Sequence, residues 1–187
     1  LTDVTGVQTC ALPILLRRGE EYAHQSLDRE LSREGRENME SIGVEITRLD
    51  HAADLPLPRY ETEGAAGMDL RAAIARPISI VPNETTRVPT GFAIAIPTGY
   101  EGQVRPRSGL AGRSSIIVPN SPGTIDSDYR GEVQILLTNI GSSPFVVEPG
   151  MRIAQLVIAP VVRANWIEVD ELPETVRGDG GFGHTGH

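Results

Sequence analysis

The sequence lacks the residues that build disulfide bonds, zinc sites or membrane spans. Its 187 residues include one cysteine, Cys10, so no internal disulfide can form, and no CxxC motif or Cys/His cluster suggests zinc. The longest early apolar stretch, residues 11–16, is far too short to cross a bilayer. Arginines follow this stretch instead of preceding it, which argues against a signal peptide. We therefore expect a reducing, cytoplasmic setting and no membrane partner.

Positive charge is also scarce. The formal net charge is -8 at pH 7, and no concentrated run of basic residues is present to replace the counterions of a nucleic acid. We therefore expect no nucleic acid polymer as a partner. A single phosphorylated small molecule remains possible, because a few arginines in one pocket suffice to bind it.

Aromatic residues make up only 4% of the chain, so the core must be built from Val, Ile, Leu and Ala. The 20 glycines and 14 prolines imply many turns and favour short strands over long helices. Strands are predicted at 42–49, 68–73, 78–81, 91–96, 102–105, 115–118, 131–139, 145–147, 151–162 and 166–169, with a helical turn near 108–112. This pattern predicts an all-β protein, either an antiparallel barrel or a double-sheet jelly roll.

The first 38 residues read differently from the rest. Residues 2–14 have neither a strand period nor a helix period, and residues 20–38 are a highly charged run with little apolar stripe. Met39 is followed at once by the first good strand. We expect Met39 to be the authentic start, because the residues before it resemble translated sequencing-adapter read-through. A natural disordered extension is the alternative.

Two predicted strands, 133–137 and 153–158, are nearly apolar on both faces apart from Gln155. One face of a sandwich formed by a single chain should be wet. Two buried faces therefore predict that part of the outer surface packs against another subunit, in an oligomer.

An arginine, a hydroxyl and a glycine follow each other at Arg107, Ser108 and Gly109. Together they can form a cradle for an oxyanion, because the glycine backbone permits a close approach. Taken alone this signal is weak, since Arg-Ser-Gly also occurs in ordinary loops.

A second polar segment, residues 123–131, contains two carboxylates. In an extended strand Asp126 and Asp128 would share one face, with Ser127 and Tyr129 on the other. The two aspartates could bind a metal directly, or one could be a general base and the other structural. The segment could also be a polar turn that caps a strand, and these residues alone leave the three readings open.

Further polar groups interrupt apolar strands. Asp69 and Arg71 lie two apart on one face of a strand, where such a pair is more often a structural ion pair than a site. Gln155 needs a hydrogen-bond partner if it is buried. The tail, residues 177–187, has a single Phe182 among glycines, and is either a frayed terminus or a segment that closes over a ligand.

In this order, the segments AGMDLRA, PRSGLA, GTIDSDYRGEV, RIAQLV and RGDGGFGHTG resemble the five motifs of the trimeric dUTPase family. The resemblance covers about Met39 to the C-terminus. It implies a jelly-roll (β-clip) homotrimer with active sites at the subunit interfaces, hydrolysis of dUTP to dUMP and pyrophosphate, and Mg²⁺ as the cofactor. It divides the chain into a non-family extension (1–38), the jelly-roll core (39–165), and a C-terminal strand with a flexible arm that closes over a neighbouring site (166–187).

The resemblance also implies roles for the residues at matching positions. Asp126 would activate the water that attacks the α-phosphorus, Tyr129 would pack on the deoxyribose, and Asp69 would contact Mg²⁺ through metal-bound water. Uracil and sugar contacts are implied for Asn120, Gly123, Thr124, Ile125, Gln134 and, by stacking, Phe182. Phosphate contacts are implied for Arg107, Ser108, Gly109, Gln155, Arg177, Gly183, His184 and Thr185.

Other functions share parts of this pattern. A dCTP deaminase resembles this fold, but such enzymes use a glutamate in the strand after the third motif and lack the IDSDY arrangement present here. A non-catalytic nucleotide-binding module would need neither Asp126 nor the complete arm, and a jelly-roll coat protein would not explain the polar residues in mid-strand. Residues 113–115, Arg-Ser-Ser, depart from many members of the dUTPase family, in a stretch that the resemblance implies supports the hairpin of residues 123–125, which would contact uracil.

Overall fold

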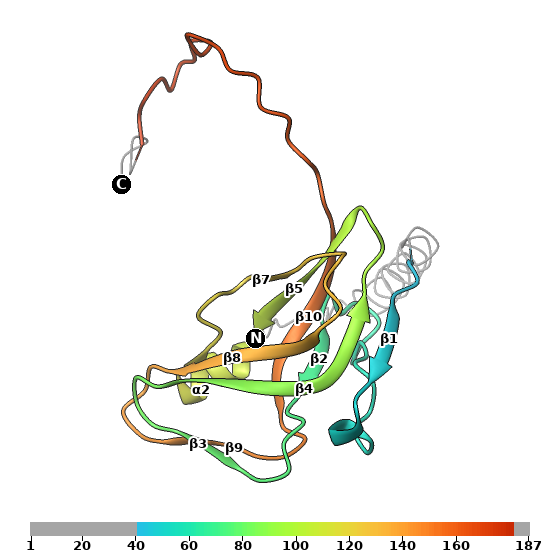
Figure 1. Ribbon diagram of the computed structural model, residues 1–187. Coiled ribbons are helices and arrows are strands. Elements are labelled where there is room, and N and C mark those ends of the chain that lie inside the picture. Colours follow the sequence, from blue (N-terminus) through green and yellow to red (C-terminus); the bar gives the residue numbers. More distant parts are fainter. Residues whose placement is uncertain (1–40, 182–187) are drawn as a thin grey trace, which may run out of the picture. The chain divides into compact units, whose positions relative to one another are not determined.

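The computed structural model describes residues 41–181 (Figure 1). The expected start at Met39 lies outside this range, and so do four predicted site residues of the tail: Phe182, Gly183, His184 and Thr185. Within residues 41–181, no helix is long and apolar enough to cross a membrane.

The described chain is mostly β, as predicted, and its strand pairs are antiparallel. One sheet has the order β1 (Glu45–Arg48), β4 (Thr85–Ala95), β8 (Glu132–Asn139), β6 (Ile116–Ile117). The second has the order β2 (Met68–Arg71), β10 (Arg152–Pro160), β5 (Tyr100–Pro106), β7 (Gly123–Ile125). A two-stranded sheet joins β3 (Ile78–Ile80) to β9 (Phe145–Val147), and the short helices are η1 (Asp50–Ala52) and α2 (Ser108–Ser114).

The two larger sheets share one aliphatic core. Val88, Ile135 and Leu137 come from the first sheet, Leu70 and Ile153 from the second, and each is at most 2% exposed. Along β8 the buried side chains alternate with more exposed ones, which is the period of two expected of a strand with one buried face. The buried core cluster consists of Val, Ile, Leu and Ala, as the composition predicts.

The main difference from the predicted strands lies in β4. It begins at Thr85, whereas the sequence predicted a strand that begins at Gly91. Pro89 and Gly91 look like strand breakers in the sequence, but the register of β4 against β8 shifts just after Pro89, at a bulge that accommodates both. Gly91 has a φ of 73°, and a Cβ at this position would overlap the side chain of Ala52, so the bulge requires glycine.

Other predicted elements differ in smaller ways. The strand predicted at 166–169 is wrong: the structure has no strand there, and Trp166 is 95% exposed. Residues 123–125, interpreted as part of a turn, form β7 and pair with β5. The predicted helical turn is confirmed as α2, which follows β5 so closely that Arg107 lies at the junction between strand and helix.

Candidate active site

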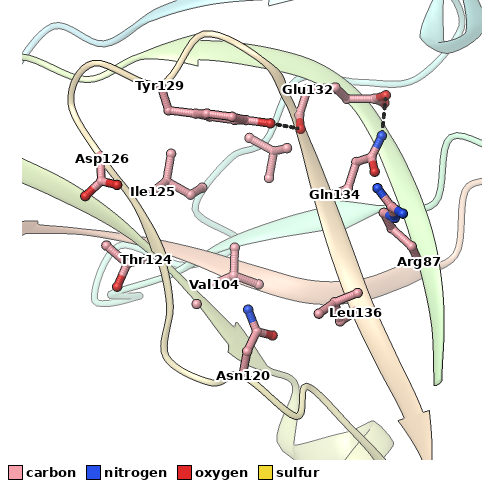
Figure 2. A pocket seen from close by; sticks show the side chains of 12 residues that line it. Arg87, Val104, Asn120, Thr124, Ile125, Asp126, Tyr129, Glu132, Gln134 and Leu136 are labelled. Carbon is pink, nitrogen blue, oxygen red and sulfur yellow. Dashed lines mark hydrogen bonds between the residues drawn. The ribbon is translucent and has the colours of Figure 1, made fainter.

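A pocket of about 470 Å³ is lined by residues of β4, β5, β7 and β8 and of the segments on either side of β7 (Figure 2). It brings together seven predicted site residues: Asn120, Gly123, Thr124, Ile125, Asp126, Tyr129 and Gln134. The remaining lining residues were not predicted: Arg87, Val104, Glu132, Val133 and Leu136. The sequence analysis therefore predicted the pocket residues in and around β7. Apart from Gln134, it missed those of β4, β5 and β8.

The floor of the pocket depends on a close backbone approach at Gly123. This residue is buried and pairs with Val104 of β5. A Cβ on Gly123 would lie 2.9 Å from Nδ2 of Asn120 and 3.4 Å from Cβ of Val104. The backbone of Gly123 therefore packs directly against the Asn120 amide, and both residues line the pocket.

Asp126 lies at the point where β7 ends and the chain turns. The amide N–H of Tyr129 donates to the carbonyl oxygen of Asp126 at 3.1 Å, so the segment is not extended beyond Ile125. This turn corrects the predicted alternation: Asp126 and Tyr129 both line the pocket, whereas Asp128 does not. The exposed carboxylate of Asp126 has no hydrogen-bond partner among residues 41–181, and is free to accept a proton or hydrogen bond from water.

The ring of Tyr129 is held against the pocket wall by its own neighbours. Its hydroxyl donates to the carbonyl oxygen of Glu132 at 3.0 Å, as Figure 2 shows. A Cβ on Gly131 would lie 2.6 Å from Cζ of the ring, so the ring packs directly on the glycine backbone. One face of the ring remains available, since the residue is 44% exposed.

Glu132, which the sequence analysis missed, is the most heavily bonded side chain of the pocket. Its carboxylate accepts hydrogen bonds from the backbone N–H of Gly91 at 2.7 Å, from Nε2 of His51 at 2.8 Å and from Nε2 of Gln134 at 3.3 Å. Partial burial by itself raises the pKa of Glu132, but these hydrogen bonds and the charge of His51 outweigh it and lower the pKa below its usual 4.5. Its period-two spacing from Gln134 was the available signal.

A second group of predicted residues surrounds Asp69. Its Oδ1 lies 2.8 Å from Nε of Arg107, and its Oδ2 lies 3.1 Å from Nη1 of Arg152. The expected pairing of Asp69 with Arg71 is wrong, because Arg71 instead donates to the carbonyl oxygen of Gly150 at 2.9 Å. The carboxylate therefore orients two guanidinium groups, and Arg152 joins the predicted phosphate-binding residues.

Three further predicted phosphate-binding residues, Ser108, Gly109 and Gln155, lie around the end of β5. Nε2 of Gln155 donates to the carbonyl oxygen of Pro106 at 2.9 Å, which provides the partner expected for a polar group in an apolar strand. Gly67 permits this placement, since a Cβ there would lie 2.6 Å from Oε1 of Gln155. Ser108 and Gly109 begin α2, directly after Arg107.

These two groups do not share a pocket within one chain. None of the residues around Asp69 lines the pocket that contains Asp126. The sheet order β2-β10-β5-β7 places Asp69 on one edge strand, while the floor of the pocket lies on the other. Arg177 is exposed in the tail, and its Nε donates to the carbonyl oxygen of Gly180 at 2.7 Å. A single chain thus holds separate halves of the predicted site.

Comparison with known proteins agrees with the family resemblance found in the sequence. The family model described as dUTPase matches residues 53–186. The chain is 57% identical over 145 residues to a deoxyuridine 5'-triphosphate nucleotidohydrolase of Rhizobium johnstonii, covering 76% of this chain and 93% of that protein. It is 56% identical over 149 residues to the protein of the same name from Methylocella silvestris, covering 79% of this chain and 93% of that one. A mutant dUTPase of Staphylococcus bacteriophage 80alpha, solved with dUpNHpp, has a similar fold with a TM-score of 0.71 at 24% identity, covering 79% of this chain and 100% of that chain.

Proposed function

The chain belongs to the dUTPase family, and from this premise we propose that Asp126 is the base that activates water in its reaction. The protein is a dUTP diphosphatase, which hydrolyses dUTP to dUMP and pyrophosphate. The observation that carries the proposed role is the exposed Asp126 carboxylate, which has no partner among the described residues and lines the pocket of about 470 Å³.

Uracil is recognised, in this proposal, by the backbone of β7 and the amide of Asn120. Because Gly123 lets the backbone come close, its donors and acceptors are fixed in space and match one pattern on the edge of a base. Cytosine reverses that pattern at two positions, and each buried group left unpaired costs about 1–3 kcal/mol. Tyr129 packs on the deoxyribose and leaves no room for a 2′-hydroxyl, while Gln134 makes a further contact.

Asp126 then orients a water molecule toward the α-phosphorus and takes its proton as the new oxygen–phosphorus bond forms. The bond to the bridging oxygen breaks on the opposite side, and pyrophosphate leaves. A positioned base contributes about 10²–10⁴-fold to such a rate. The exposure of Asp126 supports this role, because solvent can reach the carboxylate.

The phosphate chain of dUTP is bound, in this proposal, by Arg107, Ser108, Gly109 and Gln155 of another copy in a homotrimer. The separation of the two half-sites within one chain supports a shared site. Apolar side chains that remain partly exposed on the larger sheets support a subunit interface: Leu136, Val157 and Ile158. Arg177 of the C-terminal arm, together with the predicted residues that follow it, would close over the γ-phosphate and the base.

Mg²⁺ fits the residues present if the triphosphate supplies most of its ligands. No group of three or more His, Cys, Asp or Glu residues in the described chain converges on a metal position. Mg²⁺ commonly takes one or two carboxylates together with substrate phosphates and water. Arg107 and Arg152 occupy part of the acceptor capacity of Asp69 and leave room for one metal-bound water. When bound, the ion neutralises phosphate charge and orients the α-phosphate for in-line attack.

Asp126→Asn tests the proposed base. Asparagine keeps the shape and can still hold water, but it cannot take the proton. We expect turnover of dUTP to fall by about 10²–10⁴-fold while the dissociation constant for dUTP changes little. Asp128→Asn is the matched control, because Asp128 lies in the same turn but does not line the pocket. Near-wild-type turnover of Asp126→Asn would refute the assignment.

Deamination of dCTP is the alternative within this fold. The glutamate of β8 is Glu132, whose carboxylate is already bonded to three donors and so is poorly placed for proton transfer. Relatives that share more than half of their residues with this chain are named as dUTP hydrolases. Ammonia release from dCTP by the purified protein would overturn this choice.

The single Cys10 supports a further proposal, that the protein works in the reducing cytoplasm.

A further inference from the structure

A side chain accepts a backbone N–H at the β4 bulge. The register of β4 against β8 shifts between Pro89 and Ala93, and Gly91 lies within this irregular stretch. The carboxylate of Glu132 accepts this N–H at 2.7 Å, and Nε2 of His51 donates to the same oxygen at 2.8 Å. Glu132 therefore fixes the start of β8 to β4 and to η1, two elements distant in sequence.

The same residue also holds two side chains of the nucleotide pocket. Its backbone carbonyl accepts the hydroxyl of Tyr129, and its Oε2 accepts the amide of Gln134 (Figure 2). The position of the tyrosine ring thus follows the position of the first residue of β8. The bond to Gln134 fixes which way that amide faces, because its NH₂ group is directed to the carboxylate.

We propose that Glu132, anchored by His51, is a positioning residue that sets the discrimination between deoxyribose and ribose. This inference rests on the proposed function, in which the Tyr129 ring packs on the sugar. The Tyr129 ring excludes the extra 2′-hydroxyl of ribose only if the ring is held firmly in place. If the start of β8 is loosened, the Tyr129 ring can move. UTP then enters the pocket more readily, and dUTP loses part of its contact with the ring.

His51 offers the cleanest way to test this idea. Its side chain is 45% exposed, against 14% for Glu132, and it lies outside the aliphatic core, so we expect its removal to leave the fold intact. His51→Ala removes one of the three donors to the carboxylate. His51→Gln retains an N–H donor at a similar reach. Recovery of selectivity in the glutamine variant would identify the hydrogen bond, and not the bulk of the imidazole, as the cause.

Glu132→Gln tests the carboxylate itself. The glutamine oxygen can still accept the N–H of Gly91, but the negative charge that strengthens the bonds from Gly91 and His51 is removed, and the new NH₂ group requires Gln134 to turn its carbonyl oxygen toward it. Glu84→Gln is the matched control: Glu84 also accepts a backbone N–H, that of Val81 at 3.0 Å, but it does not line the pocket.

The measurement is the ratio of kcat/KM for dUTP to kcat/KM for UTP, with the melting temperature as a check on folding. We expect the ratio to fall by about fivefold in Glu132→Gln and His51→Ala, the size of one lost hydrogen bond, and to stay at the wild-type value in Glu84→Gln and His51→Gln. Structural damage alone lowers both kcat/KM values together and leaves the ratio unchanged.

Each other outcome is decisive as well. An unchanged ratio in both Glu132→Gln and His51→Ala overturns the inference, as does an equal fall in Glu84→Gln. A ratio that falls in Glu132→Gln but not in His51→Ala would show that His51 has no part in the discrimination. If Glu132→Gln does not fold, His51→Ala decides the result by itself. Failure of the wild-type protein to hydrolyse dUTP would instead refute the proposed function, and is thereby distinguished from failure of this inference.

Discussion

Replacing Asp69 with asparagine tests the part of the site that binds phosphate. Asp69 lies between two cations, 2.8 Å from Nε of Arg107 and 3.1 Å from Nη1 of Arg152, and its side chain is 15% exposed. In Asp69→Asn the new amide would retain one oxygen for Arg107, but its NH₂ group would face the donor of Arg152. Hydrogen bonds to charged groups contribute about 1.5–3 kcal/mol, and the 41% exposure of Arg152 reduces its share. We expect the free energy of unfolding to fall by about 2 kcal/mol.

Urea unfolding measures this change. At equal protein concentration, a loss of about 2 kcal/mol lowers the midpoint by about 1 M when the slope is near 2 kcal/mol/M. The same variant should need more Mg²⁺ for half-maximal activity, because the proposed contact to metal-bound water is lost. Glu61→Gln is the control: its ion pair with Arg59, at 3.4 Å, is exposed, and such pairs contribute about 0–1 kcal/mol. Unchanged stability together with an unchanged Mg²⁺ requirement would refute the reasoning.

Three further outcomes are expected. Gly123→Ala should weaken dUTP binding by about tenfold or more, measured by calorimetry, because its Cβ would lie 2.9 Å from Nδ2 of Asn120 and the pocket floor must shift. Deletion of residues 177–187 should strongly reduce dUTP turnover with no change in the melting temperature of the core; a melted core would assign the tail to structure. The lowered pKa of Glu132 means that its contribution to stability is complete above pH 4.5 and is lost as the pH falls through the folded-state value, so the difference in stability between wild type and Glu132→Gln should shrink in acid unfolding experiments.

Local patterns predicted most strands and the residues of one pocket wall. The period of two in β8 and the apolar run of β10 are visible in the sequence because they reflect burial of one or both faces. The first half of β4 was missed, because Pro89 ends a strand by local rules, and only the pairing with β8 shows that the strand continues through a bulge.

Side-chain pairing was less predictable than strand position. Spacing suggested Arg71 as the partner of Asp69, but the carboxylate instead pairs with Arg152 of β10 and with Arg107, at the junction of β5 and α2. Likewise, an extended strand would put Asp126 and Asp128 on one face, but the chain turns after Asp126 and separates them. In both cases the deciding contact joins residues whose neighbourhood is set by sheet order and turn geometry, and no local period of the sequence encodes it.

The most direct test of the account is pyrophosphate release from dUTP, dTTP, dCTP and UTP, each incubated with Mg²⁺ and either the wild-type protein or Asp126→Asn. The account predicts rapid release from dUTP alone by the wild-type protein, and release slower by orders of magnitude from the variant. Comparable rates with dCTP or UTP, or an Asp126→Asn variant that works as fast as the wild type, would contradict it.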